Sequence, residues 1–211
     1  SLQKYFLLRG QQTDLYKCIL ANTLQITTSM GSVGLVHPLS VYDDPKGGIL
    51  RRVLYKRLVY RFQFVNTLKL FSEILHWVTY GINIYSSIKE EVDFLSIDNL
   101  YHPSTIDSSL VHKGSGKVYG LKINKENSTK LIWNTKPHLN RVIKWNYDVL
   151  RLINNSFEDD LDNLLDTKSI KIHSIEILEV IRKFGNTEKH VGNYETIITE
   201  CWHETNDSSE G

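Results

Sequence analysis

Alternating apolar and polar residues near the middle of the chain give the clearest signal of secondary structure. Between Leu58 and Val65 large apolar residues occupy every second position. A period of two residues is typical of a β-strand that has one face on the core. The sequence therefore predicts a strand at 58–65, with Arg61 and Gln63 on its polar, solvent-facing side.

Helical periodicity appears in other parts of the chain. Apolar residues spaced three or four positions apart predict helices at 14–26, 67–79, 138–155 and 175–184. Polar residues typical of helix starts predict two shorter helices, one from Ser87 to about Leu95 and one at 157–165.

Short apolar runs between turn-forming residues predict the remaining strands. They lie at 4–9, 35–42, 82–86 and 193–203, with a hairpin formed by 117–124 and 130–135. The polar segment 97–109 is the clearest internal break, and 204–211 is a polar tail. The order of elements has no regular βαβ rhythm. It predicts an α+β fold in which about four to five helices pack on a mostly antiparallel sheet. Residues 1–203 form a single domain, or two closely packed lobes that meet near 97–116.

Composition excludes several classes of protein. Apolar residues make up 41% of the chain, a globular value, and 25 basic residues nearly balance 24 acidic ones. Two cysteines are too few for a disulfide scaffold or a cysteine-based zinc cluster. The sequence contains no apolar run of the roughly 20 residues that a membrane-spanning helix needs. We expect an intracellular protein, nuclear or cytoplasmic, that does not associate with membranes.

Motifs for catalysis and for cofactor binding are weak. Gly114, Gly116 and Lys117 resemble a phosphate-binding loop, but Val111 stands where the first glycine belongs and a strand follows. A hairpin turn explains these glycines better. The eight histidines do not show the spacing of a metal site, although His102, Asp107 and His112 could meet in space. We expect neither a metal nor a cofactor.

A basic segment is the least ordinary feature of the sequence. From Lys46 to Ser72 there are seven cations and no carboxylate, and aromatic residues alternate with them. Nucleic-acid-binding proteins combine cations that contact phosphates with aromatic rings that stack on bases. Segment 46–64 is therefore a candidate surface for DNA, RNA or a partner protein, through Arg51, Arg52, Lys56, Arg57 and Arg61. The alternative is an ordinary solvated face, because Tyr60, Phe62 and Phe64 share the side that is expected to form the core.

Two other features are typical of contacts with protein partners. Trp77 lies off the apolar stripe of the predicted helix 67–79, so it is a candidate exposed anchor. The predicted helix 157–165 carries an acidic cluster that favours its N-terminus and offers a docking face: Glu158, Asp159, Asp160 and Asp162.

Three functions remain after this comparison. The favoured one is a non-enzymatic subunit or adaptor of a larger assembly, which contacts other protein subunits. The alternative is a nucleic-acid-binding module that uses segment 46–64. The third is an enzyme whose active site is assembled from dispersed residues.

Overall fold

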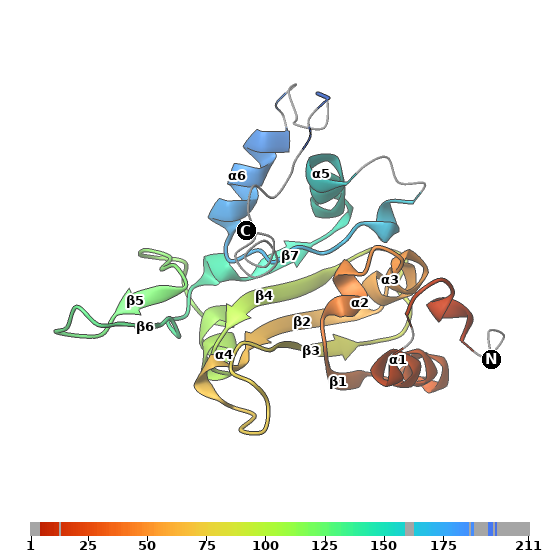
Figure 1. Cartoon of the computed structure of the whole chain (residues 1–211), viewed down its shortest axis with the longest axis horizontal. Coiled ribbons are helices and arrows are strands. Elements are labelled where there is room, and N and C mark those ends of the chain that lie inside the picture. Colours follow the sequence, from red (N-terminus) through yellow and green to blue (C-terminus); the bar gives the residue numbers. More distant parts are fainter. Residues whose placement is uncertain are drawn as a thin grey trace, which may run out of the picture.

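The computed structural model describes residues 5–12, 14–158, 163–185, 187, 194–195 and 197 (Figure 1). These residues form a five-stranded sheet, a separate two-stranded sheet and six α-helices. The α+β class predicted from the sequence is confirmed.

The large sheet is mixed. Its strands are β1 (Val33–His37), β2 (Leu58–Val65), β3 (Thr79–Tyr85), β4 (Phe94–Leu100) and β7 (Ile143–Trp145). Their order across the sheet is β1-β3-β2-β4-β7. The neighbours β2 and β4 run parallel, while the other neighbouring pairs are antiparallel. This order places β2 at the centre of the sheet.

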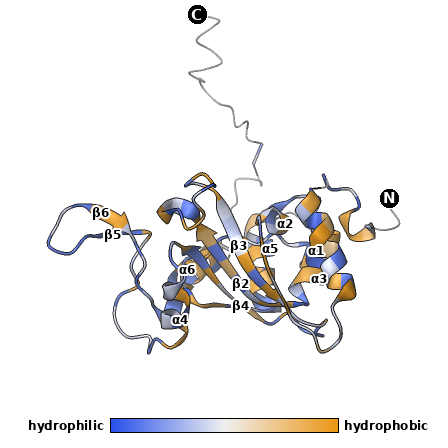
Figure 2. Ribbon diagram, turned by 90° about the horizontal axis from the view of Figure 1, so that it is seen from below, coloured by the Kyte–Doolittle hydropathy of each residue, from blue (hydrophilic) through white to orange (hydrophobic). Residues whose placement is uncertain are grey.

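Most helices lie at one end of this sheet or along one edge, while one helix lies at the opposite end (Figure 1). They are α1 (Leu15–Ile26), α2 (Ser40–Asp43), α3 (Gly48–Tyr55), α4 (Ser104–Leu110), α5 (Tyr147–Phe157) and α6 (Ile175–Gly185). Helices α1, α2 and α3 lie together at one end, α4 lies at the opposite end, and α5 packs beside α6 (Figure 1). The small sheet of β5 (Lys122–Asn124) and β6 (Leu131–Trp133) projects from the opposite end (Figure 2).

Two apolar clusters cover the two faces of β2. The larger contains a row of aromatic rings, Tyr42, Tyr55, Phe94 and Trp145, whose successive centroids lie 5.6 to 6.4 Å apart. The smaller is formed by Phe62, Phe64, Tyr80, Ile97 and Leu100. Strand β2 is therefore buried on both sides, which corrects the expectation that its Arg61 side faces solvent.

Several predicted elements agree with the structure. Helices 14–26 and 175–184 correspond to α1 and α6, and strand 58–65 is β2. The predicted strand 82–86 overlaps β3, and the predicted hairpin contains β5 and β6. These are segments in which the local residue pattern and the tertiary environment favour the same structure.

Other predictions were wrong near the N-terminus and in the centre. Residues 4–9 hold a short 3-10 helix, Phe6–Leu8, and segment 35–42 divides into the end of β1 and the start of α2. The basic segment begins with α3, which the sequence reading missed. Helix 67–79 does not form: a 3-10 turn at Asn66–Leu68 leads into an irregular loop that ends at β3.

Further corrections concern the second half. The predicted helix before Leu95 is irregular chain followed by β4, and the polar break 97–109 contains the end of that strand and α4. Segment 138–155 holds β7 before α5 begins, so it is not one helix. The predicted helix 157–165 is not continuous either, since α5 ends at Phe157 and a 3-10 turn, Leu164–Asp166, follows. The predicted strand 193–203 and the tail 204–211 lie almost wholly outside the described residues.

Candidate functional site

The five cations predicted to bind a partner do not form one surface. Arg51, on α3, is only 2% exposed. Its guanidinium donates to the backbone oxygen of Asp44 at 2.6 Å and to that of Asp166 at 2.6 and 2.9 Å. Arg51 therefore ties three segments together and is not available for a phosphate.

The neighbouring cations are more accessible. Arg52 donates two parallel hydrogen bonds, both 2.6 Å long, to the carboxylate of Asp166. Lys56 and Arg57 are half-buried at the end of α3, and Arg57 Nη1 donates to the Ser86 oxygen at 3.4 Å. Arg52, Lys56 and Arg57 reach solvent, so nucleic-acid binding by this segment stays a prediction that rests on these three residues.

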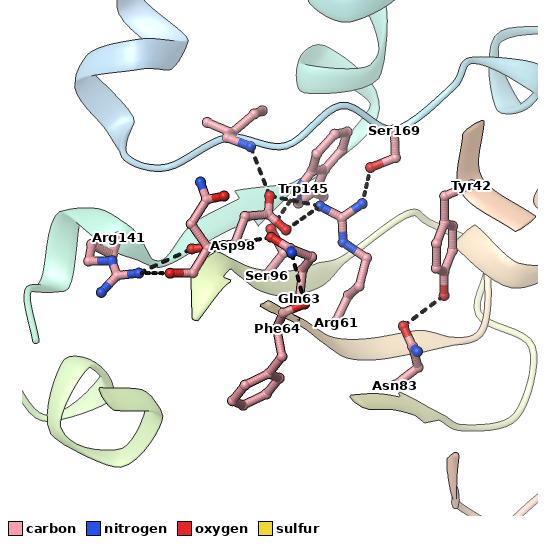
Figure 3. Close-up of polar contacts among 12 residues, drawn as sticks. Tyr42, Arg61, Gln63, Phe64, Asn83, Ser96, Asp98, Arg141, Trp145 and Ser169 are labelled. Atoms are coloured by element: carbon pink, nitrogen blue, oxygen red, sulfur yellow. Dashed lines mark hydrogen bonds and ion pairs between the residues drawn. The ribbon is translucent and has the colours of Figure 1, made fainter. Parts of the chain in front are cut away.

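Arg61 forms a buried ion pair in the centre of the sheet (Figure 3). It is 3% exposed, and its Nη2 lies 3.0 Å from Asp98 Oδ2 on the parallel strand β4. Its Nη1 donates to the Ser169 hydroxyl, and its guanidinium carbon lies 5.2 Å from the centroid of the Trp145 ring. A buried cation needs such neutralising partners. They explain how an arginine can occupy a position that the sequence suggested was exposed.

Asp98 is completely enclosed. Besides Arg61 it accepts the Ile172 amide at 2.8 Å. Burial raises the pKa of the Asp98 carboxyl, while Arg61 and the Ile172 amide oppose this rise. With no exposed surface, the carboxylate cannot reach a substrate in this structure. The Arg61–Asp98 pair is therefore suited to fixing strand positions.

An irregularity in β4 beside this pair is closed by side chains. Asn99 has a positive φ of 58°, and the register between β2 and β4 shifts there. Gln63 Oε1 accepts the Asn99 amide at 2.6 Å, and Arg141 Nη2 donates to the oxygens of Asp98 and Asn99 (Figure 3). Buried Gln63 of β2 and buried Arg141 of the 3-10 turn Leu139–Arg141 thus hold the distorted backbone of β4.

The acidic docking face can be followed only in part. Glu158 accepts the Lys168 amide at 3.0 Å, and its carboxylate lies 3.3 Å from Lys168 Nζ. Together with Lys46 and Asp166 these residues line a cavity of about 320 Å³ beside α3, where positive and negative groups are mixed. Asp159, Asp160 and Asp162 lie outside the described residues, so docking through them stays a prediction.

An apolar loop between β2 and β3 is exposed to solvent. Segment 66–78, called here the β2–β3 loop, carries six large apolar side chains that are at least 40% exposed: Leu68, Leu70, Phe71, Ile74, Leu75 and Trp77. Trp77 is 61% exposed, and the His76 ring lies edge to face against its ring, 4.7 Å between centroids. The predicted anchor is thus at the surface, although on a loop.

Asn66 gives this loop a defined shape. Its buried side-chain amide donates to the backbone oxygens of Phe71 and Ile74 at 2.8 and 2.9 Å and accepts the Phe71 amide at 3.0 Å. Lys69 adopts a left-handed conformation with φ of 51°. Phe71 packs edge-on against Tyr80, 5.0 Å between ring centroids. The loop is therefore held from within, while its outer apolar side chains remain in solvent.

The sequence predicted Trp77 as an exposed anchor but placed it on a helix, because the apolar spacing of this segment resembles that of a helix. The spacing does not mark Leu70 and Ile74 as exposed, and an asparagine at position 66, just before the spaced apolar residues, is typical of a helix cap. An asparagine that caps a turn is equally able to bond the backbone of a loop. The signal that could have revealed the loop is the absence of a facing apolar partner, which one sequence does not contain.

Comparisons with known proteins give no family or relative. No protein-family model matches the chain, and neither curated proteins nor solved structures show a significant similarity to it. The described part of the chain contains no group of three or more histidine, cysteine, aspartate or glutamate side chains that could hold a metal ion. His102, Asp107 and His112 therefore do not form a ligand set there. None of the helices among the described residues is long and apolar enough to cross a membrane.

Proposed function

We propose that this protein is a non-enzymatic subunit of an intracellular assembly that binds a partner protein through the β2–β3 loop. The observation that carries the proposal is the cluster of six exposed large apolar side chains on this loop. Contiguous apolar surface rimmed by polar residues is typical of interaction sites. Trp77 is the expected anchor, since tryptophan is enriched among the residues that dominate binding energy.

The order within the loop supports the same proposal. Two hydrogen bonds that the Asn66 side chain donates and one that it accepts fix the backbone that carries Phe71 and Ile74. A surface that is shaped before binding loses less conformational entropy when it docks. The loop therefore presents its apolar side chains in one arrangement that an apolar groove can match.

Charge favours a protein over a membrane as the partner. The loop contains one lysine and one glutamate, Lys69 and Glu73, and one histidine, His76. Attachment to an anionic bilayer draws on clusters of basic residues beside the apolar ones, and this loop has no such cluster. Apolar contact with a protein groove needs no net charge.

The test is recovery of a partner from native cells with matched variants. The variant Leu75→Ser/Trp77→Ser removes two exposed loop residues, and Leu15→Ser/Ile26→Ser removes two exposed apolar residues of α1. We expect wild type and the α1 variant to retain the same partner, and the loop variant to lose it. With the purified partner, the loop variant should bind at least about 30-fold more weakly.

Two further measurements test whether the loop binds a second copy of the chain or a lipid surface in place of a partner protein. Sedimentation at rising concentration detects binding to a second copy of the chain, and vesicle flotation detects binding to lipid. Self-association or flotation that the loop variant abolishes would assign the surface to that occupant instead. Equal partner recovery by wild type and the loop variant would overturn the proposal.

A further inference from the structure

A second surface lies at the opposite end of the molecule from α1 and α3. Residues 111–137, called here the arm, connect α4 to the 3-10 turn Leu139–Arg141 and contain β5 and β6. The two strands pair with each other and not with the five-stranded sheet. The arm therefore projects beyond the body of the protein (Figures 1 and 2).

The arm concentrates positive charge. It contains one carboxylate, Glu126, and six lysines: Lys113, Lys117, Lys122, Lys125, Lys130 and Lys136. Its net charge is +5 and that of the whole chain is +1, so the rest of the chain carries −4. All six lysines are exposed, and none forms an ion pair with a carboxylate of the described residues. The nearly neutral composition of the chain conceals this local polarity.

The strand register places three of the lysines on the two faces of the arm, Lys122 on one face and Lys125 and Lys130 on the other. Lys122 is paired with Trp133, and Ile123 with Ile132. Continuing this register places Lys125 directly opposite Lys130, and the Lys125 amide donates to the Lys130 oxygen at 2.8 Å. Like charges at facing positions repel each other. An anion between or beside them would remove this repulsion.

Hydrogen bonds fix the shape of the arm. Asn134 Nδ2 donates to the backbone oxygens of Tyr119 and Gly120 at 3.2 and 2.8 Å. At the base, the Thr105 hydroxyl donates to the Thr135 oxygen at 2.9 Å, and the Trp133 ring packs 4.8 Å from that of Tyr101 on the body. An isolated two-stranded hairpin is only marginally stable in water, so these contacts stabilise the arm. The lysines are thus carried on an anchored support.

The aromatic rings of the arm hold lysines. Lys136 Nζ lies 4.7 Å from the centroid of the Tyr119 ring, and Lys122 Nζ lies 4.6 Å from that of Trp133. Binding of single strands relies on rings that stack against bases. Here the rings contact ammonium groups and the body, which favours contacts to phosphates over stacking.

We propose that the arm binds duplex nucleic acid through its phosphate backbone, without sequence specificity. A two-stranded β-ribbon fits the major groove of DNA, and lysines on both faces of such a ribbon can reach phosphates on both sides of the groove. This site is distinct from segment 46–64, for which nucleic-acid binding remains a separate prediction. The inference is independent of the β2–β3 loop, since neither surface includes a residue of the other.

Fluorescence anisotropy with a labelled 20-base-pair DNA duplex of arbitrary sequence tests the proposal. The arm variant is Lys122→Gln/Lys125→Gln/Lys130→Gln, and the control is Lys144→Gln/Arg151→Gln/Lys183→Gln, which removes the same charge from exposed positions elsewhere. We expect wild type to bind at about 50 mM salt, with affinity that falls steeply as salt rises. The arm variant should bind at least about tenfold more weakly. The slope of its log affinity against log salt concentration should become shallower by about three.

The outcomes separate the alternatives. The control should stay within about twofold of wild type, because phosphate contacts and not net charge alone set the affinity. No binding at low salt, or equal losses in both variants, would overturn the proposal. So would tighter binding to single strands, or equal binding to polyglutamate, which would indicate an acidic protein as the partner. If the variant Lys56→Gln/Arg57→Gln lost binding while the arm variant bound like wild type, the binding site would lie in 46–64 and not in the arm. If the triple arm variant unfolds, Lys125→Gln alone should still weaken binding about twofold or more.

Discussion

The carboxyl group of Asp166 lies against Gly48, the first residue of α3, in the space where any other residue would carry its Cβ. A Cβ on Gly48 would lie 2.7 Å from Asp166 Cγ and 2.8 Å from Oδ1. Arg52 holds both carboxylate oxygens at 2.6 Å, so the group cannot move aside freely. A negative charge at this position also suits the helix dipole. The contact joins α3 to the distant 3-10 turn, Leu164–Asp166.

Gly48→Ala should therefore destabilise the protein. The added methyl group must displace a carboxylate that Arg52 holds, and overpacking of this kind costs about 1–3 kcal/mol. The measurement is the free energy of unfolding in urea. Gly120→Ala, whose Cβ would have no heavy atom within 4 Å, is the control and should change stability by no more than about 0.5 kcal/mol. In an Asp166→Ala background the cost of Gly48→Ala should largely disappear. If it persists there, the contact is not its cause.

The buried ion pair gives a second prediction. Arg61→Met leaves Asp98 as an enclosed carboxylate without its cation, and removing one member of such a pair costs about 3–5 kcal/mol. Lys144→Met is the matched control, because the Lys144–Asp93 pair is 3.4 Å long and both side chains are more than half exposed. It should change the free energy of unfolding by less than about 1 kcal/mol. If urea denaturation showed similar losses of unfolding free energy in the two variants, burial would have no special role in the Arg61–Asp98 pair.

The same pair shows why the sequence predicted β2 but not its surroundings. The two-residue period at 58–65 is local, so it could be read directly. Arg61 is buried only because Asp98 lies beside it on β4, and Asp98 belongs to a stretch whose polar residues resemble a loop. Each polar residue looks exposed until its partner is known. A partner 37 positions away is set by the parallel pairing of β2 with β4, which depends on the whole fold.

Apolar spacing led to wrong predictions of secondary structure in two other places. The β2–β3 loop has helix-like spacing, yet its side chains face solvent, and spacing alone cannot separate a core-facing stripe from an exposed one. In 138–155 the buried Ile143 and Trp145 alternate with exposed Lys144, and Asn146 then caps α5 through its bond to the Val149 amide at 3.0 Å. That cap was the missed signal. The exposure of Arg51 and Arg61 was predicted less well than the fold, because exposure and pairing follow from tertiary contacts.

Histidine burial predicts a pH dependence of stability. His37 Nδ1 lies 2.6 Å from the Pro38 oxygen, which can only accept, and Nε2 lies 2.9 Å from the Tyr85 hydroxyl. Burial lowers the pKa of His37, although the bond to Pro38 opposes this. The folded state therefore binds fewer protons than the unfolded state, in which the pKa is about 6.5. Stability is complete above that pH and declines as the pH falls towards the folded pKa, by at most about 1.4 kcal/mol per pH unit.

Urea unfolding at pH 5 to 8 measures this effect. His37→Gln should show a smaller decline below about pH 6.5 than wild type, whatever its stability at pH 8. Burial also lowers the pKa of His173, so some decline should remain. An unchanged slope in His37→Gln would show that His37 does not contribute.

Asn66 allows the shape of the β2–β3 loop to be separated from its surface chemistry. Asn66→Ala removes three hydrogen bonds, to Phe71 and Ile74, and leaves every exposed apolar side chain in place. Amide hydrogen exchange in 68–78 should become about 10- to 100-fold faster, because the loop then opens without unfolding the domain. Asn124→Ala, at an exposed position of β5, is the control and should leave hydrogen exchange in 68–78 unchanged.

Affinity for the partner should fall in Asn66→Ala as well, since a disordered loop must be ordered again on binding. Faster exchange with undiminished affinity would mean that the apolar side chains act without a fixed arrangement.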